Sequence, residues 1–381
     1  MLIGICGARC AGKSTVAQYL VEHHGFDQLY LARPQEQDEQ AQDGIPKTVP
    51  VSKDLALTPR LLNGQPRLST FASEGDLLDF VTKHWRKRWV TTDVRSEAVL
   101  DALSRRPFFI LVSVDAPVTV RWRRHQARRQ RRVGDGSGSS RSSDENIGSP
   151  KLRDDADADA DGPISLEAFV AESDAHLYDA ETGVLPLMSR AAIRLLNTSD
   201  SLAHLYATLG KLDLTDGDRL RPGWDSYFMA LASLAARRCN CMKRAVGCVL
   251  VDGKRRVIST GYNGTPRGLT NCMDGGCPRC NAGDLASGAS LATCLCLHAE
   301  ENALLEAGRE RIRDGSVLYC NTCPCLTCSI KIVQVGIREV VYSQGYSMDG
   351  ETARVFLSAG VKLRQFSPPA EGLIQLERMS K

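Results

Sequence analysis

Hydrophobic and polar positions in the first part of the chain alternate between strand-like and helix-like patterns. Continuous apolar runs predict buried strands at Leu2–Cys6 and Phe108–Val114, and a helical pattern covers Thr15–His23. A further strand-like run, Ala191–Asn197, follows another helical stretch and returns to the same pattern. Strands that alternate with helices in this way are typical of α/β folds with a parallel sheet.

Residues 133–163 interrupt this pattern, because they contain almost no apolar side chains and include a repeating Asp-Ala stretch. Such a segment cannot bury enough apolar surface to offset the entropy lost on ordering. We therefore expect a disordered linker inserted into a first domain that comprises residues 1–132 and 164–215.

A second domain is predicted over residues 221–369, followed by a C-terminal tail at 370–381. Its expected elements are, in order, helix Asp225–Cys239, strands 246–251 and 256–262, an irregular Gly/Cys-rich stretch 264–297, a helix from His298, a strand–loop–helix unit at 316–336, strand 339–343, a helix near 350–359 and strand 361–366. This order predicts a mixed sheet with helices packed on its faces.

The overall charge of the chain is close to balance, with a formal net charge of +3 over 381 residues. Bulk electrostatics therefore gives no support for a stable nucleic-acid partner. No apolar run approaches the roughly 20 residues that a membrane-spanning helix needs. Because the apolar start, Met1–Cys6, leads into a glycine-rich loop rather than a signal-peptide cleavage site, we expect an intracellular protein.

The 14 cysteines are unevenly distributed, since Cys6 and Cys10 stand alone and the other twelve fall between Cys239 and Cys328. In an intracellular chain, clustered cysteines with CxxC spacing indicate metal binding more often than disulfides. Zinc is the metal that such clusters most often bind.

A catalytic metal centre is predicted from His298, Cys325 and Cys328, with Glu300 beside it. The combination of His-x-Glu with a later Pro-Cys-x-x-Cys is the signature of zinc nucleobase deaminases. One imidazole and two thiolates supply the three protein ligands of a catalytic zinc and leave its fourth position open for water. Glu300 would then carry protons between that water, the ring nitrogen and the leaving ammonia. The alternative is a structural zinc finger in which Glu300 is only a solvated helix residue.

Four segments carry a resemblance to a known family: Gly261–Gly268 (GYNGTPRG), His298–Gly308 (HAEENALLEAG), Cys323–Cys328 (CPCLTC) and Val341–Tyr346 (VYSQGY). With them, residues 221–369 resemble the deoxycytidylate deaminases of the zinc-dependent cytidine deaminase superfamily, the fungal two-domain form in particular. The resemblance implies a three-layer α/β/α domain that deaminates dCMP to dUMP and ammonia, supplying thymidylate synthesis. It also implies a hexamer that dCTP activates and dTTP inhibits. The expected compartment is the cytoplasm, with the nucleus as the alternative.

The same resemblance implies roles for four substrate or effector residues. Asn263 should lie in the pocket and hydrogen-bond the sugar or base, while Asn302 and Tyr346 should line the substrate or effector site. Arg309 should bind the 5′-phosphate, a role that suits a guanidinium because it can engage phosphate through two hydrogen bonds. For Arg309, a solvated charge at a helix end is the alternative.

Six further cysteines suggest a second, structural metal site: Cys241, Cys272, Cys277, Cys280, Cys294 and Cys296. A viral member of the family has a structural zinc whose ligands correspond to positions near Cys241, Cys272 and Cys296. Because this chain has extra cysteines, the choice of ligands stays open, and free buried thiols are the alternative. The remaining cysteines, at 239, 248, 320 and 323, fit strand or core positions.

The N-terminal segment Gly7–Ser14 is a complete GxxxxGK[ST] loop between a predicted strand and a predicted helix. The N–H groups of Gly7 to Gly12 and of Thr15 would surround phosphates, Lys13 would reach their oxygens, and Ser14 would hold Mg²⁺. The domain resembles nucleoside-monophosphate and dephospho-coenzyme A kinases.

A phosphate-binding domain of this kind needs further charged groups. Asp93 is a candidate near the magnesium, and Arg121–Arg132 would form either a lid over the phosphates or a solvated basic helix. Since no phosphoryl-acceptor site can be recognised, we prefer nucleotide binding without phosphoryl transfer.

Two other functions use the same motifs. A polynucleotide deaminase would need a basic channel with stacking aromatic residues, which a chain with 6% aromatic residues and near-neutral charge does not favour. A nucleotide kinase with a structural zinc domain is the other alternative, and it predicts that Glu300 has no role in activity.

Overall fold

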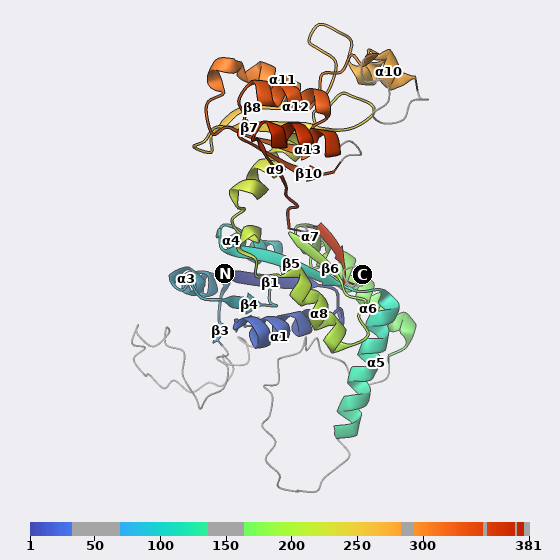
Figure 1. Cartoon of the computed structure of the whole chain (residues 1–381). Helices are drawn as coiled ribbons and strands as arrows, with labels where there is room; N and C mark the ends of the chain where they lie inside the picture. Colours follow the sequence, from blue (N-terminus) through green and yellow to red (C-terminus); the bar gives the residue numbers. More distant parts are fainter. Residues whose placement is uncertain (33–68, 136–163, 283–292, 346–348, 370–371, 377–381) are drawn as a thin grey trace. The chain divides into compact units, whose positions relative to one another are not determined.

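The computed structural model describes residues 1–32, 69–135, 164–282, 293–345, 349–369 and 372–376. They form two compact units, one made of Met1–Leu220 with Ala370–Lys381 and the other of Arg221–Pro369 (Figure 1). The segment 136–163, for which the sequence predicts disorder, lies outside the described residues.

The first unit is built on a seven-stranded sheet in which every pair of neighbouring strands is parallel. Its strands, in the order in which they lie side by side, are β12 (Gly372–Gln375), β6 (Ile193–Leu196), β5 (Phe109–Asp115), β1 (Leu2–Gly7), β4 (Trp89–Thr91), β2 (Asp27–Leu31) and β3 (Ser69–Phe71). All six residues of β1 are buried, as expected for a central strand that is covered on both faces.

Helices cover both faces of this sheet. They are α1 (Lys13–His24), α3 (Glu74–Lys83), α4 (Glu97–Ser104), α5 (Val118–Asp135), α6 (Leu166–Tyr178), α7 (Leu185–Ser189) and α8 (Leu202–Leu212). On one face α1 and α8 lie together, with the rings of Tyr19 and Tyr206 5.0 Å apart. On the other face Arg190, which ends α7, pairs with Glu97 and Asp101 of α4 (Figure 1).

The second unit has a five-stranded mixed sheet between two layers of helices (Figure 1). Its strands lie in the order β11 (Lys362–Gln365), β10 (Glu339–Gln344), β9 (Val317–Thr322), β7 (Gly247–Val251) and β8 (Val257–Tyr262), with β7 antiparallel to both of its neighbours. Helix α9 (Trp224–Ala236) packs on one face, while α11 (Ala299–Ala307), α12 (Leu326–Gln334) and α13 (Asp349–Ser358) cover the other.

Helix α9 is attached to the far end of the sheet by a charged contact. Two guanidinium nitrogens of Arg364 on β11 donate to the carboxylate of Asp225, at 2.8 and 3.0 Å, and the Tyr319 hydroxyl donates to the same group at 2.8 Å. These hydrogen bonds lower the pKa of Asp225, the bond from Arg364 contributing most.

The predicted fold class is confirmed: an α/β chain with a parallel sheet is followed by a three-layer α/β/α unit. Helix α1 begins at Lys13, two residues before the predicted start, and α5 continues to Asp135. The prediction of a tail at 370–381 is wrong for β12, which pairs with β6. Ile374 and Leu376 lie in the core of the first unit, so apolar burial draws this short segment back to the first sheet.

Candidate active site

The first part of the site is the start of helix α11. His298 is its N-cap residue, and its backbone N–H donates to the carboxylate of Glu301 at 3.0 Å. Glu301 also pairs with Lys331 of α12, which ties the two helices together. Glu300, the second residue of the helix, is only 4% exposed and points into the protein instead of toward water. Capping therefore fixes both His298 and Glu300 at one end of one helix.

The first turn of α11 lies unusually close to strand β8. A Cβ atom on Gly261 would be 2.1 Å from the carbonyl oxygen of Ala299, so only glycine permits this approach. The side-chain amide of Asn302 donates to the carbonyl of Tyr262 at 3.0 Å and joins the same two elements. The GYNG and HAEEN segments thus position one another.

The second part of the site is the start of helix α12. Cys325 is its N-cap residue and Cys328 lies in its first turn. The Sγ atoms of Cys325 and Cys328 are each 3.3 Å from Nδ1 of His298. Around a tetrahedral zinc with Zn–S of about 2.3 Å and Zn–N of about 2.0–2.1 Å, such atoms lie roughly 3.5–3.8 Å apart. One imidazole and two thiols at this spacing fit zinc.

Charge around these three side chains is strongly perturbed. A hydrogen bond from Cys328, assisted by His298 and opposed by burial, lowers the pKa of Cys325 to about 3. The neighbouring Cys325 in turn raises the pKa of His298. Burial raises the pKa of Glu300, so this carboxyl group holds a proton more readily than a solvated glutamate does. A carboxyl group of this kind is suited to accept and return a proton.

A cavity of about 100 Å³ is lined by His298, Cys325 and Glu300, while the third ligand, Cys328, is fully buried behind its wall. Besides these lining residues and several apolar or neutral groups, three cationic side chains line it: Lys243, Arg244 and Arg279. Arg279 is 8% exposed, an unusual burial for arginine, and donates to Sγ of Cys280 at 3.9 Å. The cavity thus has a metal-binding and proton-transferring end and a cationic wall.

Comparison with known proteins identifies the family. Over 371 residues the chain is 43% identical to the deoxycytidylate deaminase of Schizosaccharomyces pombe, which covers 97% of this chain and 99% of that protein. The chain belongs to the deoxycytidylate deaminase family. The deoxycytidylate deaminase of Saccharomyces cerevisiae is 40% identical over 378 residues, covering 96% of this chain and 97% of that protein. The predicted family and its fungal two-domain form are thereby confirmed.

The second unit of this deoxycytidylate deaminase family member contains the region shared with shorter relatives. Residues 222–344 match the family "Cytidine and deoxycytidylate deaminase zinc-binding region". The deoxycytidylate deaminase of Mycobacterium phage D29 is 44% identical over 128 residues, which is 32% of this chain and 95% of that protein. The zinc predicted from the sequence accords with the matched family and with the ligand geometry.

Of the three predicted substrate residues that the structure describes, one lies at the cavity. Asn263 lines it and is 6% exposed, with its amide bonded to the backbone of Val246 (2.9 Å) and Arg244 (2.7 Å). Asn302 makes the contact with β8 described above. Tyr346 lies outside the described residues.

Arg309, the predicted phosphate ligand, lies beyond the opposite end of α11 from His298. Its side chain is exposed and donates to the carbonyl of Gln334 at 3.3 Å, and it is not among the residues that line the cavity. The helix between them separates Arg309 from the metal end. The cations of the cavity wall are not among the residues predicted from the sequence, although Arg279 stands inside the Cys277–Cys280 motif.

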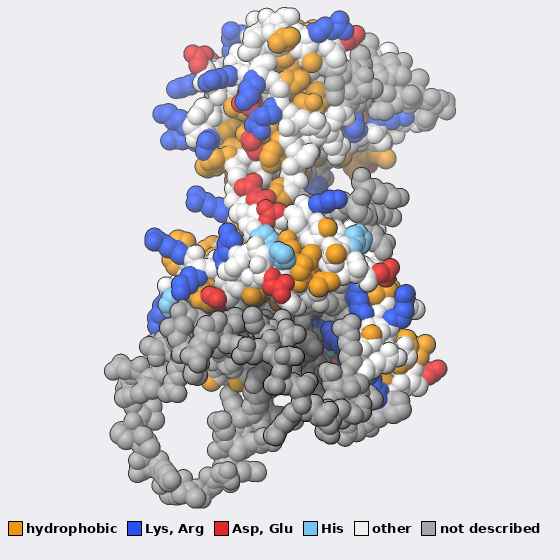
Figure 2. All heavy atoms as spheres, turned by 60° about the horizontal axis from the view of Figure 1, so that its bottom comes forward, with side chains coloured by type: hydrophobic (Ala, Val, Ile, Leu, Met, Phe, Trp, Pro, Cys, Tyr) orange, Lys and Arg blue, Asp and Glu red, His pale blue; other side chains and the backbone are white. Residues whose placement is uncertain are grey.

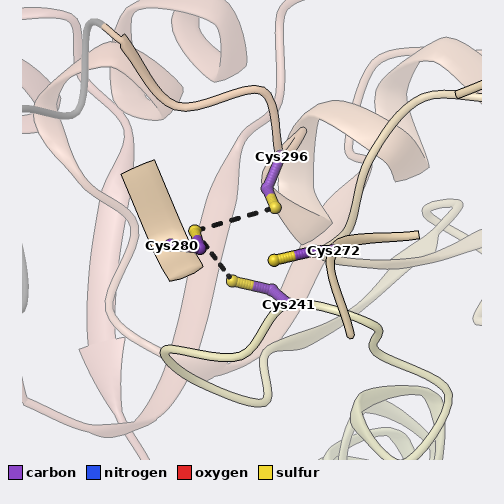
Figure 3. A group of neighbouring side chains, drawn as sticks. All are labelled: Cys241, Cys272, Cys280 and Cys296. Atoms are coloured by element: carbon purple, nitrogen blue, oxygen red, sulfur yellow. Dashed lines mark hydrogen bonds between the residues drawn. The ribbon is translucent and has the colours of Figure 1, made fainter. Parts of the chain in front are cut away.

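All six cysteines that the sequence assigns to a structural metal site lie together beside this cavity. Figure 3 shows four of them, Cys241, Cys272, Cys280 and Cys296, converging on one point from separate segments. Cys280 comes from the short helix α10 (Pro278–Asn281), and Cys272 from a 3₁₀ turn at Cys272–Asp274. None of the 14 cysteines forms a disulfide.

The phosphate-binding loop of the first unit has the predicted strand–loop–helix context, since β1 ends at Gly7 and α1 begins at Lys13. Gly7 adopts φ +138°, and a Cβ there would lie 2.0 Å from the carbonyl oxygen of Val114. Lys13 Nζ donates to the carbonyls of Gly7 (3.1 Å) and Ala8 (3.2 Å), whereas Ser14 and Thr15 lie half-buried in the first turn of α1.

Neighbouring side chains hold this loop in place. Asn197 and Arg124 donate to the carbonyl oxygen of Ala11 at 2.8 and 3.0 Å. Asp93 follows β4, the strand next to β1, so it lies at the same edge of the sheet as the loop. Its carboxylate accepts from the backbone of Leu31 at 2.8 Å and from Arg95 at 2.5 Å.

Two arginines of the basic segment 121–132 face inward: Arg124 contacts the loop, and Arg121 is 5% exposed and bonds the carbonyl of Ala116 at 2.9 Å.

Among the helices that the structure describes, none is both long enough and apolar enough to cross a lipid bilayer.

Proposed function

We propose that the second unit catalyses the hydrolysis of dCMP to dUMP and ammonia. The observation that carries this proposal is the placement of buried Glu300 in the same cavity as His298 and Cys325, which form a metal-binding group with Cys328. The relatives from Schizosaccharomyces pombe and Saccharomyces cerevisiae, which match nearly the whole chain, bear the name deoxycytidylate deaminase, which supports this substrate.

In this proposal His298, Cys325 and Cys328 hold the zinc, and Glu300 moves the protons. Bound zinc lowers the pKa of water toward 7 and so supplies a hydroxide nucleophile at neutral pH. Glu300 accepts the proton that water loses as its oxygen bonds to C4 of cytosine, and delivers it to N3. Glu300 then carries the second proton to the exocyclic nitrogen, the C4–N bond breaks, and ammonia leaves as the C4 carbonyl forms.

The cationic wall gives a place for the 5′-phosphate. Lys243, Arg244 and Arg279 line the same cavity as Glu300, so one small molecule can contact both groups. A dianionic phosphate is bound well by partly buried guanidinium groups, because each can donate two hydrogen bonds. We therefore assign phosphate recognition to this wall instead of to Arg309, with Asn263 supporting the backbone of Arg244.

For the first unit we propose binding of a nucleoside triphosphate with Mg²⁺, without phosphoryl transfer. The closely packed loop after β1, with Lys13 at the helix start and Asp93 beside it, supports this proposal. We also propose, from the family resemblance, that the chain forms a hexamer, that dCTP activates it and that dTTP inhibits it. The cytoplasm is the proposed compartment, since 14 free thiols suit a reducing environment.

Charged groups on the surface agree with a small substrate. On the face drawn in Figure 2, Lys and Arg side chains are interspersed with acidic and hydrophobic ones over the described surface. A strand of nucleic acid would be bound best by a continuous basic groove with aromatic platforms.

A substrate panel tests the proposal. The purified full-length chain should release ammonia from dCMP faster than from CMP, deoxycytidine or a cytosine-containing single-stranded oligonucleotide. Faster ammonia release from the oligonucleotide than from dCMP would contradict the proposal and would indicate a polynucleotide deaminase. Phosphoryl transfer from ATP in the absence of any ammonia release would favour the kinase alternative.

A further inference from the structure

The six cysteines beside the active cavity form two overlapping groups of four. One group is Cys241, Cys272, Cys280 and Cys296, and the other is Cys277, Cys280, Cys294 and Cys296. In each group every sulfur lies within 4.8 Å of the other three. Two residues, Cys280 and Cys296, belong to both groups, so the six sulfurs outline two tetrahedra that share an edge.

The distances between sulfurs fit metal thiolates and exclude disulfides. Zn–S bonds of about 2.3 Å place the sulfurs of a tetrahedral site about 3.8 Å apart, whereas a disulfide needs about 2.05 Å. Cys280 Sγ lies 3.8 Å from Cys241, 3.9 Å from Cys296 and 3.6 Å from Cys294. The sulfurs of Cys277 and Cys294 are 3.9 Å apart.

A single metal ion would leave two of these six thiols without a metal. Four of the cysteines are at most 7% exposed: Cys272, Cys277, Cys280 and Cys296. The other two, Cys241 and Cys294, are partly buried and pack against them, so all six form one largely buried cluster. We propose that this cluster binds two zinc ions, with Cys280 and Cys296 bridging them. Cys241 and Cys272 complete the coordination of one ion, and Cys277 and Cys294 complete that of the other.

Charge is compatible with two ions. Six thiolates around two zinc ions leave a net charge of −2, the same as four thiolates around a single ion, so the second ion adds no uncompensated charge. Part of that net charge is balanced by Arg279, whose guanidinium is 3.9 Å from Cys280 Sγ. Backbone N–H groups also point at the terminal sulfurs, from Met242 to Cys272 at 3.5 Å and from Leu295 to Cys277 at 3.4 Å.

The cluster also forms part of the cavity wall, because Cys241, Cys294 and Cys296 line the cavity together with Arg279. Arg279 lies on α10, between two of the proposed ligands. The two ions would therefore hold the cation that we assign to the substrate phosphate. That last consequence rests on the proposed function, whereas the number of metal ions does not.

Metal analysis of the full-length protein tests the proposal. Elemental analysis should find three zinc ions per chain, one at His298, Cys325 and Cys328 and two in the cluster. The double variant Cys277→Ser/Cys294→Ser should retain two, because the other four cysteines still form a complete site. The matched double variant Cys241→Ser/Cys272→Ser should also retain two. Cys325→Ala, which leaves the cluster intact, is the control for loss of the catalytic zinc.

Bridging is tested separately, on wild-type protein reconstituted with ¹¹³Cd. Bridging thiolates predict a scalar coupling between the two cadmium resonances of the cluster, a result that stays informative if a double variant fails to fold. Two zinc ions per wild-type chain, unchanged in Cys277→Ser/Cys294→Ser, would overturn the proposal. Iron in place of zinc, or two uncoupled cadmium resonances, would overturn it as well. None of these outcomes depends on whether dCMP is the substrate.

Discussion

Replacing Arg279 separates the two candidate phosphate ligands of the chain most clearly. Arg279 is 8% exposed and lines the cavity that contains Glu300, whereas Arg309 is exposed beyond the far end of α11. Arg279→Ala should therefore weaken the use of dCMP, while Arg309→Ala should leave it unchanged. Deoxycytidine, which has no phosphate, should be processed equally by all three proteins.

The size of the expected effect follows from burial. Truncating one partner of a buried, hydrogen-bonded charge pair costs about 2–5 kcal/mol. At about 1.4 kcal/mol for each factor of ten, kcat/KM for dCMP should fall roughly 30- to 4000-fold in Arg279→Ala. Arg279→Lys keeps the charge but loses the planar pair of donors, so its loss should be smaller.

Ammonia release measured at several dCMP concentrations, with deoxycytidine in parallel, gives these ratios. Zinc content must be determined on each variant, because Arg279 also contacts Cys280 and a loss of metal would mimic a loss of phosphate binding. The assignment is refuted if Arg279→Ala keeps the wild-type preference for dCMP with full zinc content. It is also refuted if Arg309→Ala abolishes that preference.

Three other changes probe separate parts of the chain. Cys325→Ala should lose the catalytic zinc together with ammonia release, because His298 and Cys328 alone hold the metal poorly; full zinc content in this variant would argue against the ligand set. Lys13→Ala should abolish binding of MgATP or MgdCTP in calorimetry without changing dCMP turnover in the absence of effectors, and intact binding would remove the role of the loop. Asp225→Asn should destabilise the second unit by about 1–2 kcal/mol in urea unfolding at pH 7, because a charged hydrogen-bond acceptor for Arg364 is lost. Because folding lowers the pKa of Asp225 from 3.8, the extra stability of the wild-type protein over Asp225→Asn is present at pH 7 and is lost as the pH falls through the lowered pKa. Equal urea midpoints for the two proteins at pH 7 would contradict this role of Asp225.

The parts of the site that sequence predicts well are those in which spacing along the chain determines position in space. His298 and Glu300 belong to one helix start, and Cys325 and Cys328 to another, so local structure brings each pair together. The motif also predicts that the two helix starts lie close together, because a catalytic zinc needs three protein ligands and His298 is on one helix while both cysteines are on the other.

Arg309 shows where such reasoning stops. It follows the catalytic helix in the sequence, but a helix of nine residues places its two ends roughly 12 Å apart. The cations that reach the cavity come instead from segments far from His298 in the sequence, at 243–244 and at Arg279. Contacts between segments far apart in the sequence leave no local pattern from which they could be predicted. For the same reason the sequence does not predict strand β12, whose place is determined by its pairing with β6.

Comparison of wild type with Glu300→Gln tests the central claim most directly. Both proteins should contain the same zinc and show the same unfolding behaviour, since Glu300 is not a metal ligand in the proposed site. The variant should form dUMP from dCMP about 10²- to 10⁴-fold more slowly, the usual contribution of a general acid–base group. Near-wild-type turnover in a fully zinc-loaded Glu300→Gln protein would contradict the account.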